Sequence, residues 1–427
     1  MIAAGETSTF PRFLDLASPN IAHGDGVWLF TTDGRRILDA CSGGAMVTSL
    51  GHGASEIIDA GRAQAEKIAY FYMDHFTNEP MERLAERLIE IAAPEMARVR
   101  FTSSGSEANE TALRLARAYH VDRGSAERWR VISPVQAYHG STMATLALTG
   151  RRRSLQAPYE PYLSQHLHIQ LDADAKSALR ELDERLEEAG PETVAAFFCE
   201  PVGGAARPAF TPPAEFWSGL AERRRRHGFL VCFDEVVTGI GRTGSWFAYQ
   251  DLPLVPDIVT TGKGLGAGYA PICAVLCTQP VYDAVDRGSR FFDLGHTWDG
   301  APISCATGLA VLEAIVERRL IERVRDRGPR LLSELQGALR GIPLVREVRG
   351  RGFLLGVELV ELPDEAHMDE RIEQHAFENG LLVTTTHSNL DGYVGDQVVF
   401  APAFTASDGE LTMMIERLAA TLREVAA

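Results

Sequence analysis

Short apolar runs, each about the length of one strand, recur through the middle of the chain. They are rich in β-branched and aromatic residues, which is typical of strands covered on both faces. The runs lie at residues 99–102, 131–133, 194–199, 229–233, 256–261 and 272–277. Stretches predicted to be helices separate them, at residues 80–92, 103–119, 178–189 and 213–227. This alternation predicts an α/β fold with a mostly parallel central sheet that helices cover on both faces.

The two ends of the chain show other patterns. Residues 27–31 and 37–40 form a predicted hairpin with Asp33-Gly34 at its turn. Toward the other end, a long helix from residue 303 precedes strands at 345–348 and 353–359 and a closing helix at 408–425. We expect both ends to form a smaller α+β domain. The predicted parts are an N-terminal segment that joins the small domain (1–65), a large domain (66–305) and a C-terminal small domain (306–427).

Composition and charge narrow the class of protein. The chain has 427 residues, of which 45% are hydrophobic and 23% charged, a balance typical of globular domains. Its net charge of -16 argues against a nucleic-acid partner or an anionic membrane surface, because either would require a basic face. No signal-peptide pattern opens the chain, and no apolar run is long enough to span a membrane.

The six cysteines give no sign of a metal site. None of them has C-x-x-C spacing, and several lie inside apolar runs, where a thiol behaves as a small buried hydrophobic group. We therefore expect no metal ligands and a reducing, cytoplasmic location.

Candidate chemistry is concentrated in residues 229–268. An apolar strand there runs into Asp234-Glu235, and Lys263 follows later among four glycines. Desolvation at the end of a buried strand lowers the pKa of a lysine and frees its amine as a nucleophile for Schiff-base chemistry. If the electrophile is the aldehyde of pyridoxal phosphate, the ring nitrogen of this cofactor needs a facing carboxylate, for which Asp234 is the candidate. Taken singly, the acidic pair could end a strand and the lysine could lie in a solvated loop.

Together these segments resemble the class III aminotransferases. The matching motifs are Asp-Glu-Val-x-Thr-Gly-x-Gly-Arg-Thr-Gly at 234–244 and Pro-Asp-Ile-x-Thr-x-Gly-Lys-Gly-Leu-Gly at 256–266. The resemblance implies the type I aminotransferase fold, with pyridoxal 5'-phosphate bound in the large domain. It also implies that Lys263 forms the Schiff base with the cofactor, that Asp234 pairs with the pyridine nitrogen, and that Val236 packs on one ring face.

A second candidate site opens the predicted helix at 103–119. A helix N-terminus presents unpaired N–H groups, so the amides of Gly105 and Ser106 and the hydroxyls of Ser104 and Ser106 suit a phosphate. Ser104 and Glu107 also have the spacing of a simple capping box. Beside the lysine segment we favour the phosphate interpretation, because the resembling family shows Gly-Ser-Glu-Ala-Asn-Glu at its phosphate cup.

Further cofactor contacts follow from the same resemblance. In the shared segment 137–141, Tyr138 is expected to stack on the other face of the cationic ring, and His139 to support the site structurally rather than to catalyse. Glu200 ends a predicted strand and either orders the site or pairs with a basic neighbour, of which we favour the first. Ligands of parallel sheets lie at the carboxyl ends of the strands, where Glu200, Asp234 and Lys263 all fall.

The resemblance also implies a partner subunit. In the family, a threonine in the segment Gly-His-Thr-Trp, here Thr297, reaches the phosphate of the partner's cofactor, so we expect a homodimer with shared active sites. The loop at 41–46 is expected beside the substrate. Nearby aromatic residues either line that pocket or pack under a helix, and we favour packing for most of them, with Tyr70 and Phe71 as candidate substrate contacts. The aromatic set is Tyr70, Phe71, Tyr72 and Phe76.

The predicted function is transamination between a small-molecule amine or omega-amino acid and a small keto acid. Lys263 would hold the cofactor and then, once released, move the proton between substrate and cofactor. A racemase, an epimerase or a phospho-lyase shares the same cofactor site and stays an alternative. A binding or regulatory protein with this fold would lack the lysine or the aspartate, and both are present.

The amino acceptor is predicted from departures from the glutamate-specific members of the family. Those members bind a dicarboxylate with an arginine, which corresponds to Arg349 here. In them a glutamate gates this arginine and a glutamine follows Asp-Glu-Val. This chain has Ala205 in place of the glutamate and Val237 in place of the glutamine. Small apolar residues at both positions favour pyruvate and leave Arg349 either a substrate contact or a structural charge. Many pyruvate-specific members carry a mobile arginine a few residues after an Ala-Pro pair. In this chain the pair begins at Ala401, and the position that corresponds to the arginine, counted without gaps, holds Asp408.

Overall fold

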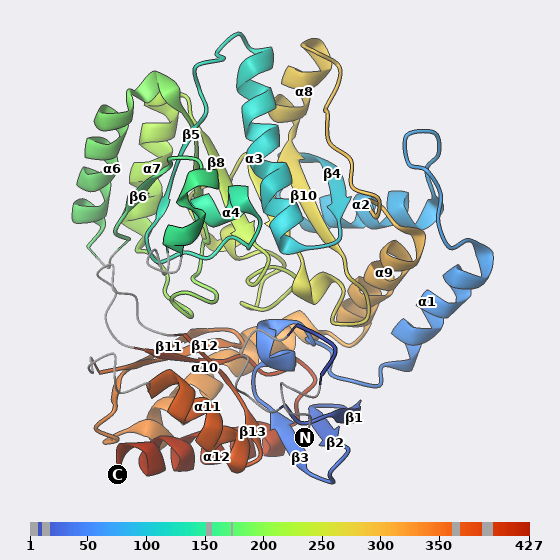
Figure 1. The fold of residues 1–427 in the computed structure, drawn as a ribbon, viewed down its shortest axis with the longest axis vertical. Coiled ribbons are helices and arrows are strands. Elements are labelled where there is room, and N and C mark those ends of the chain that lie inside the picture. Colours follow the sequence, from blue (N-terminus) through green and yellow to red (C-terminus); the bar gives the residue numbers. More distant parts are fainter. Residues whose placement is uncertain (1–6, 11–17, 151–155, 172–173, 361–367, 387–395) are drawn as a thin grey trace.

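A seven-stranded sheet forms the centre of the larger part of the molecule (Figure 1). The computed structural model describes residues 7–10, 18–150, 156–171, 174–360, 368–386 and 396–427. Strands β6, β5, β7, β8 and β9 pair in parallel, whereas β10 pairs antiparallel with both β9 and β4. In spatial order the strands are β4 (Met96–Thr102), β10 (Cys273–Thr278), β9 (Ile258–Thr261), β8 (Leu230–Glu235), β7 (Val194–Cys199), β5 (Arg130–Pro134) and β6 (Leu167–Ile169). The predicted mostly parallel sheet is confirmed.

Helices cover both faces of this sheet because successive strand residues point to opposite sides. On β7, Phe198 packs in the cluster formed with helix α3, whereas the ring of Phe197 lies 6.1 Å from that of Phe216 on α7. One face carries α3 (Gly105–Asp122), α4 (Met143–Leu148) and α8 (Gln279–Arg287). The other carries α2 (Glu79–Ile91), α6 (Ala175–Ala189), α7 (Ala214–His227) and α9 (Pro302–Glu317). The core thus extends through the sheet in both directions.

Two four-stranded sheets lie in the lower part of the molecule, where both chain termini are found (Figure 1). The first consists of β1 (Ile21–Asp25), β2 (Trp28–Thr31), β3 (Arg36–Asp39) and β13 (Leu381–Leu382); the second of β11 (Val345–Arg351), β12 (Leu354–Leu359), β15 (Gln397–Phe400) and β14 (Thr384–Thr386). The remaining helices are α1 (Ser55–Lys67), α10 (Leu320–Leu339), α11 (Met368–Glu378) and α12 (Asp408–Ala426).

Strand pairing joins the two ends of the chain. The hairpin predicted at the N-terminus is confirmed as β2 and β3. From the C-terminal region, β13 adds to it in parallel, with Leu381 opposite Leu38. This pairing supports the proposal that the N-terminal segment joins the small domain, while the exact domain boundaries stay a prediction.

The connections of the large sheet gather at one edge. Strands β7, β8 and β9 end at Cys199, Glu235 and Thr261. Because β10 runs antiparallel to β9, its first residues lie at the same edge, with Ala274 opposite Thr261. Helix α3 begins three residues after β4 ends. These elements bring the predicted lysine, aspartate and phosphate segments to the same edge.

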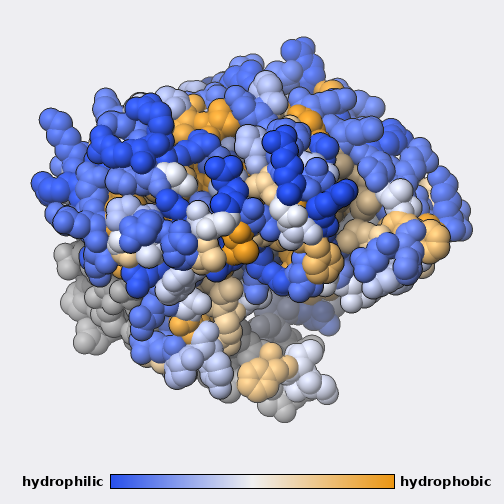
Figure 2. Space-filling view, turned by 90° about the horizontal axis from the view of Figure 1, so that it is seen from above, coloured by the Kyte–Doolittle hydropathy of each residue, from blue (hydrophilic) through white to orange (hydrophobic). Residues whose placement is uncertain are grey.

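The face at the top of the molecule in Figure 1 is mainly hydrophilic. Figure 2 shows this face from above, with apolar residues scattered between charged ones. Apolar residues scattered singly are ordinary on a protein surface. Among the described residues, no helix combines the length and the apolar character that a membrane span requires.

Candidate active site

A cavity of about 170 Å³ lies at the carboxyl ends of the parallel strands. Its walls include a lysine, an aspartate, a glutamate, a histidine and the first turn of helix α3. Its lining residues are Gly105, Ser106, Asn109, Tyr138, His139, Gly140, Glu200, Asp234, Val236, Val237, Lys263 and Cys273. Most of the residues predicted to contact the cofactor therefore line one pocket.

Lys263 follows strand β9 and adopts a left-handed backbone conformation, with φ of 41°. Such a conformation is unusual for a residue with a side chain and is common at functional sites. Burial lowers the pKa of Lys263, while the negative charges of Asp234 and Glu200 oppose this shift. The net effect makes the free amine more accessible near neutral pH.

The residue before the lysine has to be glycine. A Cβ atom on Gly262 would lie 2.2 Å from Cys273 Sγ, which is closer than any real contact. The small residue lets β9 and β10 approach each other where the lysine leaves the sheet. The chain has only three lysines, and the other two, Lys67 and Lys176, are exposed on helices α1 and α6. Lys263 is thus the one lysine placed for chemistry in a buried site.

Asp234 is fixed through both of its carboxylate oxygens. Oδ1 accepts a hydrogen bond from the backbone N–H of Val236 at 3.0 Å. Oδ2 accepts one from Asn109 Nδ2 at 2.6 Å and lies 2.9 Å from His139 Nδ1. These contacts hold the carboxylate in one orientation at the end of β8.

Asn109 and Thr260 are functional candidates that sequence reasoning missed. Asn109 also donates to the carbonyl of His139 at 2.7 Å, and its Oδ1 accepts from the Thr260 hydroxyl at 2.6 Å. The sequence signal that could have identified Asn109 is helical spacing, because Asn109 lies one turn after Gly105 and so on the same face of α3. Thr260 precedes the lysine by three residues and pairs with Asp234 across β8 and β9. Together they connect α3, β8 and β9 around one carboxylate.

His139 supports Asp234 from a fully buried position. Its Nδ1 meets the carboxylate, its ring packs edge-on against Phe198 at 4.9 Å, and Nε2 has no hydrogen-bond partner among the described residues. Its backbone N–H donates to the Thr149 hydroxyl at 3.0 Å. This geometry supports the structural role proposed for the histidine.

The first turn of α3 is compatible with both interpretations of its serines, the helix cap and the phosphate site. Ser104 caps the helix, because its hydroxyl accepts a hydrogen bond from the Glu107 N–H at 3.2 Å. The Glu107 carboxylate accepts from the backbone and side chain of Ser103, so the reciprocal contact is shifted by one residue from a regular capping box. The first backbone hydrogen bond of the helix runs from Ala108 N to Ser104 O. The N–H groups of Gly105 and Ser106 come before it and so have no acceptor within the helix, and both residues line the cavity. Ser104 itself does not line the cavity.

Small residues bring neighbouring loops close to this turn. The hydroxyl of Ser106 accepts from the Ser141 N–H at 3.0 Å. A Cβ on Gly140 would lie 2.6 Å from that hydroxyl, and Gly140 has a φ of 136° that favours glycine. A Cβ on Gly105 would lie 3.0 Å from the Val236 side chain. Val236 therefore packs directly beside the helix N-terminus.

Glu200 lies behind the lysine at the end of β7. Its Oε1 accepts from the Gly204 N–H at 2.9 Å and its Oε2 from the Tyr138 N–H at 3.4 Å. Burial raises the pKa of Glu200 to about 7, with His139 opposing the shift and Asp234 adding to it. No ion pair joins Glu200 to a basic residue in the described part of the chain, which favours a role in ordering the site.

Several predicted contacts lie outside the cavity. Thr297 is exposed, and its predicted contact with a partner's cofactor stays a prediction. Tyr70 is 43% exposed and contacts the Trp298 ring edge-on at 5.6 Å, and Phe76 is 66% exposed. Packing of these aromatic residues under a helix was therefore wrong for the single chain. Tyr70 and the half-buried Phe71 also do not line the cavity.

Arg349 is committed to the protein's own groups. Its Nη1 contacts the carboxylates of Glu358 at 2.5 Å and Glu347 at 3.0 Å. Its Nε donates to the Pro208 carbonyl at 2.9 Å, and its Nη2 donates to Gln397. All three nitrogens are occupied, and the residue lies outside the cavity around Lys263. These contacts support the structural alternative, while a substrate role for Arg349 stays a prediction.

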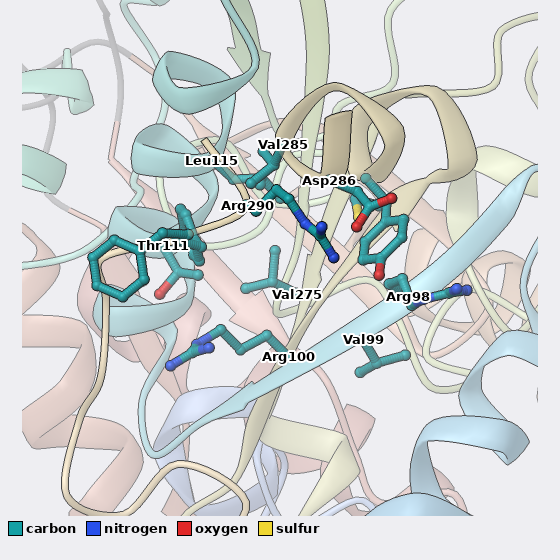
Figure 3. Close-up of a pocket in the computed structure, with 13 residues that line it drawn as sticks. Arg98, Val99, Arg100, Thr111, Leu115, Val275, Val285, Asp286 and Arg290 are labelled. Atoms are coloured by element: carbon teal, nitrogen blue, oxygen red, sulfur yellow. The ribbon is translucent and has the colours of Figure 1, made fainter. Parts of the chain in front are cut away.

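A second cavity, of about 280 Å³, lies between β4, β10, α3 and α8 (Figure 3). Its walls are mainly apolar, and the side chains of Arg98 and Arg100 point away from each other. Arg98 stacks over the Tyr282 ring at 4.3 Å, and Arg100 pairs with Asp299 at 3.0 Å. Because no lysine lines it, this cavity is not the candidate for Schiff-base chemistry. A search of the described residues for clusters of His, Cys, Asp or Glu that could hold a metal ion finds none.

Comparisons with known proteins agree with this geometry. The family model for class-III aminotransferases matches residues 15–422. The uncharacterized aminotransferase YodT of Bacillus subtilis is 33% identical over 429 residues, covering 96% of both chains. The putrescine–pyruvate aminotransferase of Pseudomonas aeruginosa is 29% identical (98% of this chain, 94% of the relative), and the diaminobutyrate–2-oxoglutarate transaminase of Halomonas elongata is 31% identical (95% and 90%).

A solved structure shows the same fold. The PLP-bound crystal structure of an amine transaminase from an uncultivated Pseudomonas species has a TM-score of 0.89 and 32% identity, covering 98% of this chain and 96% of that one. The fold is therefore the type I aminotransferase fold, and the chain is that of a transaminase. It belongs to the class-III aminotransferases, a family of pyridoxal-phosphate-dependent enzymes, as the motifs in its sequence predicted.

Proposed function

We propose that this aminotransferase transfers the amino group of an amine or an omega-amino acid to a small keto acid such as pyruvate, using pyridoxal 5'-phosphate held by Lys263. The observation that carries the proposal is the cavity in which Lys263, Asp234 and the N-terminus of α3 meet. When bound, the cofactor supplies an electron sink that stabilises a carbanion at the substrate carbon.

The donor groups of the cavity fit this cofactor. Lys263 offers an amine for its aldehyde, and Asp234 offers a carboxylate for its protonated ring nitrogen. The N–H groups of Gly105 and Ser106, at the positive end of the helix dipole, suit its phosphate. Tyr138 and Val236, which also line the cavity, are proposed to contact its ring. Each requirement of the cofactor is thus met by a different element of the fold.

The residues of this chain would perform three tasks. Lys263 would bind the cofactor through Nζ and, once displaced by substrate, accept and return a proton at the same atom. Asp234 would place its carboxylate opposite the ring nitrogen, which supports protonation of that nitrogen. Asn109 and His139 would keep that carboxylate in place.

The choice of acceptor rests on the groups near the cavity. Val237 lines it and Ala205 packs in the adjoining apolar cluster, so neither supplies a charge for a second carboxylate. Arg349 is engaged by Glu358 and Gln397. These contacts support a small monocarboxylate acceptor. The relatives themselves differ, since one is named for pyruvate and another for 2-oxoglutarate.

We also infer a homodimer in which Thr297 serves the partner's site. Large apolar side chains that a single chain leaves exposed support this inference, because such residues are enriched in interfaces. They include Tyr70, Tyr72, Phe76, Phe291 and Trp298. The six cysteines are all free and buried, which supports the proposal of a reducing, cytoplasmic location.

A side-by-side assay tests the proposal. The purified enzyme, loaded with pyridoxal phosphate, is given an amine donor such as putrescine with either pyruvate or 2-oxoglutarate. We expect pyruvate to give a kcat/KM roughly tenfold higher, the order of one charged contact that 2-oxoglutarate would lack. A preference for 2-oxoglutarate overturns the choice of acceptor. Loss of optical activity from a chiral amino acid, or release of phosphate from a phosphorylated amine, without any keto acid would favour the racemase or lyase alternative.

A further inference from the structure

Strand β14 carries three successive threonines whose side chains point alternately to two sides. The Thr384 hydroxyl donates to the carbonyl of Gly44, and the Thr386 hydroxyl donates to the carbonyl of Ala205. Thr385, between them, faces away, and both its N–H and its hydroxyl donate to Glu373 at 2.8 Å. One face of a short strand thus binds two loops that are 161 residues apart in the chain.

Each of these loops is closed at its base by its own backbone bonds. In the first, Met46 N donates to Cys41 O at 2.9 Å, so that Gly44 lies near the tip. In the second, Gly203 N donates to Phe210 O at 2.8 Å, and Ala205 lies toward the tip. The threonine hydroxyls therefore add a hydrogen bond near the tip of each loop, beside the bonds that the Gly43 N–H makes to Asp39 and the Gly204 N–H makes to Glu200.

Both loops adjoin the candidate active site. A Cβ on Gly204 would lie 2.7 Å from Glu200 Oε1 and 2.9 Å from Val237 Cγ2, and both of these side chains line the cavity. The other loop leads into Thr48 and Ser49, which pack against the segment that follows Lys263: a Cβ on Gly268 would lie 2.9 Å from Thr48 Cγ2, and one on Gly264 would lie 3.8 Å from Ser49 Oγ. A shift of either loop would therefore move groups next to the lysine.

We propose that Thr384 and Thr386 are positioning residues that fix the separation of the two loops and thereby set the size of amine the site accepts. The inference rests on the proposed function of the Lys263 site. The hydroxyls touch neither the cavity nor the lysine, so they act through the loops. Without them, the loop tips sample wider positions, which weakens binding of the amine more than the chemical step.

The alternation of the strand offers a matched control. Thr384→Val/Thr386→Val removes both hydroxyls and keeps the side-chain shape, Thr384→Ser/Thr386→Ser keeps both hydroxyls, and Thr385→Val changes the same strand on its other face. For 1-phenylethylamine with pyruvate, we expect the double valine variant to raise the amine KM roughly tenfold, the order of two lost neutral hydrogen bonds. We expect kcat to stay within about twofold, because the lysine and its partners are unchanged. The serine pair and Thr385→Val should behave as wild type.

Hydrogen–deuterium exchange of the cofactor-loaded protein measures the loops without relying on activity. Peptides covering residues 41–47 and 203–210 should exchange faster in the double valine variant, and at the wild-type rate in Thr385→Val. Unchanged exchange, or equal effects of Thr385→Val, overturns the proposal. If wild type shows no transamination while the loops still loosen selectively, the proposed function fails and the positioning role stands. A rise in KM that the serine pair does not restore also contradicts it.

Discussion

Replacing Asn109 with alanine tests the network that holds Asp234. Asn109 donates to the aspartate at 2.6 Å and accepts from Thr260 at 2.6 Å, entirely within the protein interior. Hydrogen bonds to charged groups contribute about 1.5–3 kcal/mol. Asp234 retains its bonds to Val236 and His139, so we expect the lower half of that range, which corresponds to a loss of roughly 10–30-fold in kcat/KM.

The assay compares two identical substitutions. Asn379 donates to the Thr421 hydroxyl at 3.1 Å and to the Glu424 carboxylate at 2.8 Å, far from the cavity, between α11 and α12. Asn379→Ala also loses a bond to a carboxylate and a bond to a threonine hydroxyl, so it controls for the loss of an asparagine that does not line the cavity. We expect it to retain wild-type kcat/KM, whereas Asn109→Ala should also release cofactor faster on dialysis. Wild-type kcat/KM in Asn109→Ala would refute the reasoning.

Three further predictions concern other parts of the site and its surroundings. Burial raises the pKa of Glu200 from 4.5 to about 7, so its contribution to stability is present below about pH 4.5 and lost as pH rises through 7. Thermal unfolding from pH 5 to 8 should therefore show wild type losing stability relative to Glu200→Gln, and a pH-independent difference would contradict this. Arg349→Met removes the nearer of the two arginines that pair with the buried Glu358, leaving Arg346 at 3.4 Å, and should lower the free energy of unfolding by about 2 kcal/mol. Chemical denaturation measures that loss, and a changed pyruvate-to-2-oxoglutarate ratio would show that the arginine contacts substrate. Thr297→Ala should weaken cofactor retention on dialysis while light scattering still reports a dimer; a fully active wild-type monomer would exclude the shared site.

The sequence predicted the parts of the fold whose signals are local. Runs such as 194–199 and 229–233 became buried strands because apolar residues continue through them on both faces of the sheet. The end of α7 is equally local, since Gly228 adopts the left-handed conformation, with φ of 75°, that stops the helix. The antiparallel direction of β10 was not predicted, because strand direction depends on the path of the chain rather than on composition.

The candidate site was predicted where motifs carry the chemistry and missed where distant residues meet. Lys263 and Asp234 stand in motifs, whereas Asn109 reaches Asp234 across 125 positions. The partners of Arg349 were not predicted either: Glu358 and Gln397 lie on strands β12 and β15 of the same sheet as Arg349, and Gln397 is 48 positions away along the chain. The predicted packing of Tyr70 and Phe76 under a helix failed for a different reason. Aromatic residues suggest a core, and no single-chain pattern distinguishes a core from a surface that another subunit covers.

Borohydride reduction followed by peptide mass spectrometry tests the central claim most directly. Reduction makes the bond between a lysine and pyridoxal phosphate permanent, and the three lysines of the chain occur on separate segments. The account predicts the cofactor mass on Lys263 alone, no adduct and no transamination in a folded Lys263→Ala variant, and wild-type behaviour in Lys67→Ala and Lys176→Ala. An adduct on Lys67 or Lys176, or an active Lys263→Ala enzyme, would contradict it.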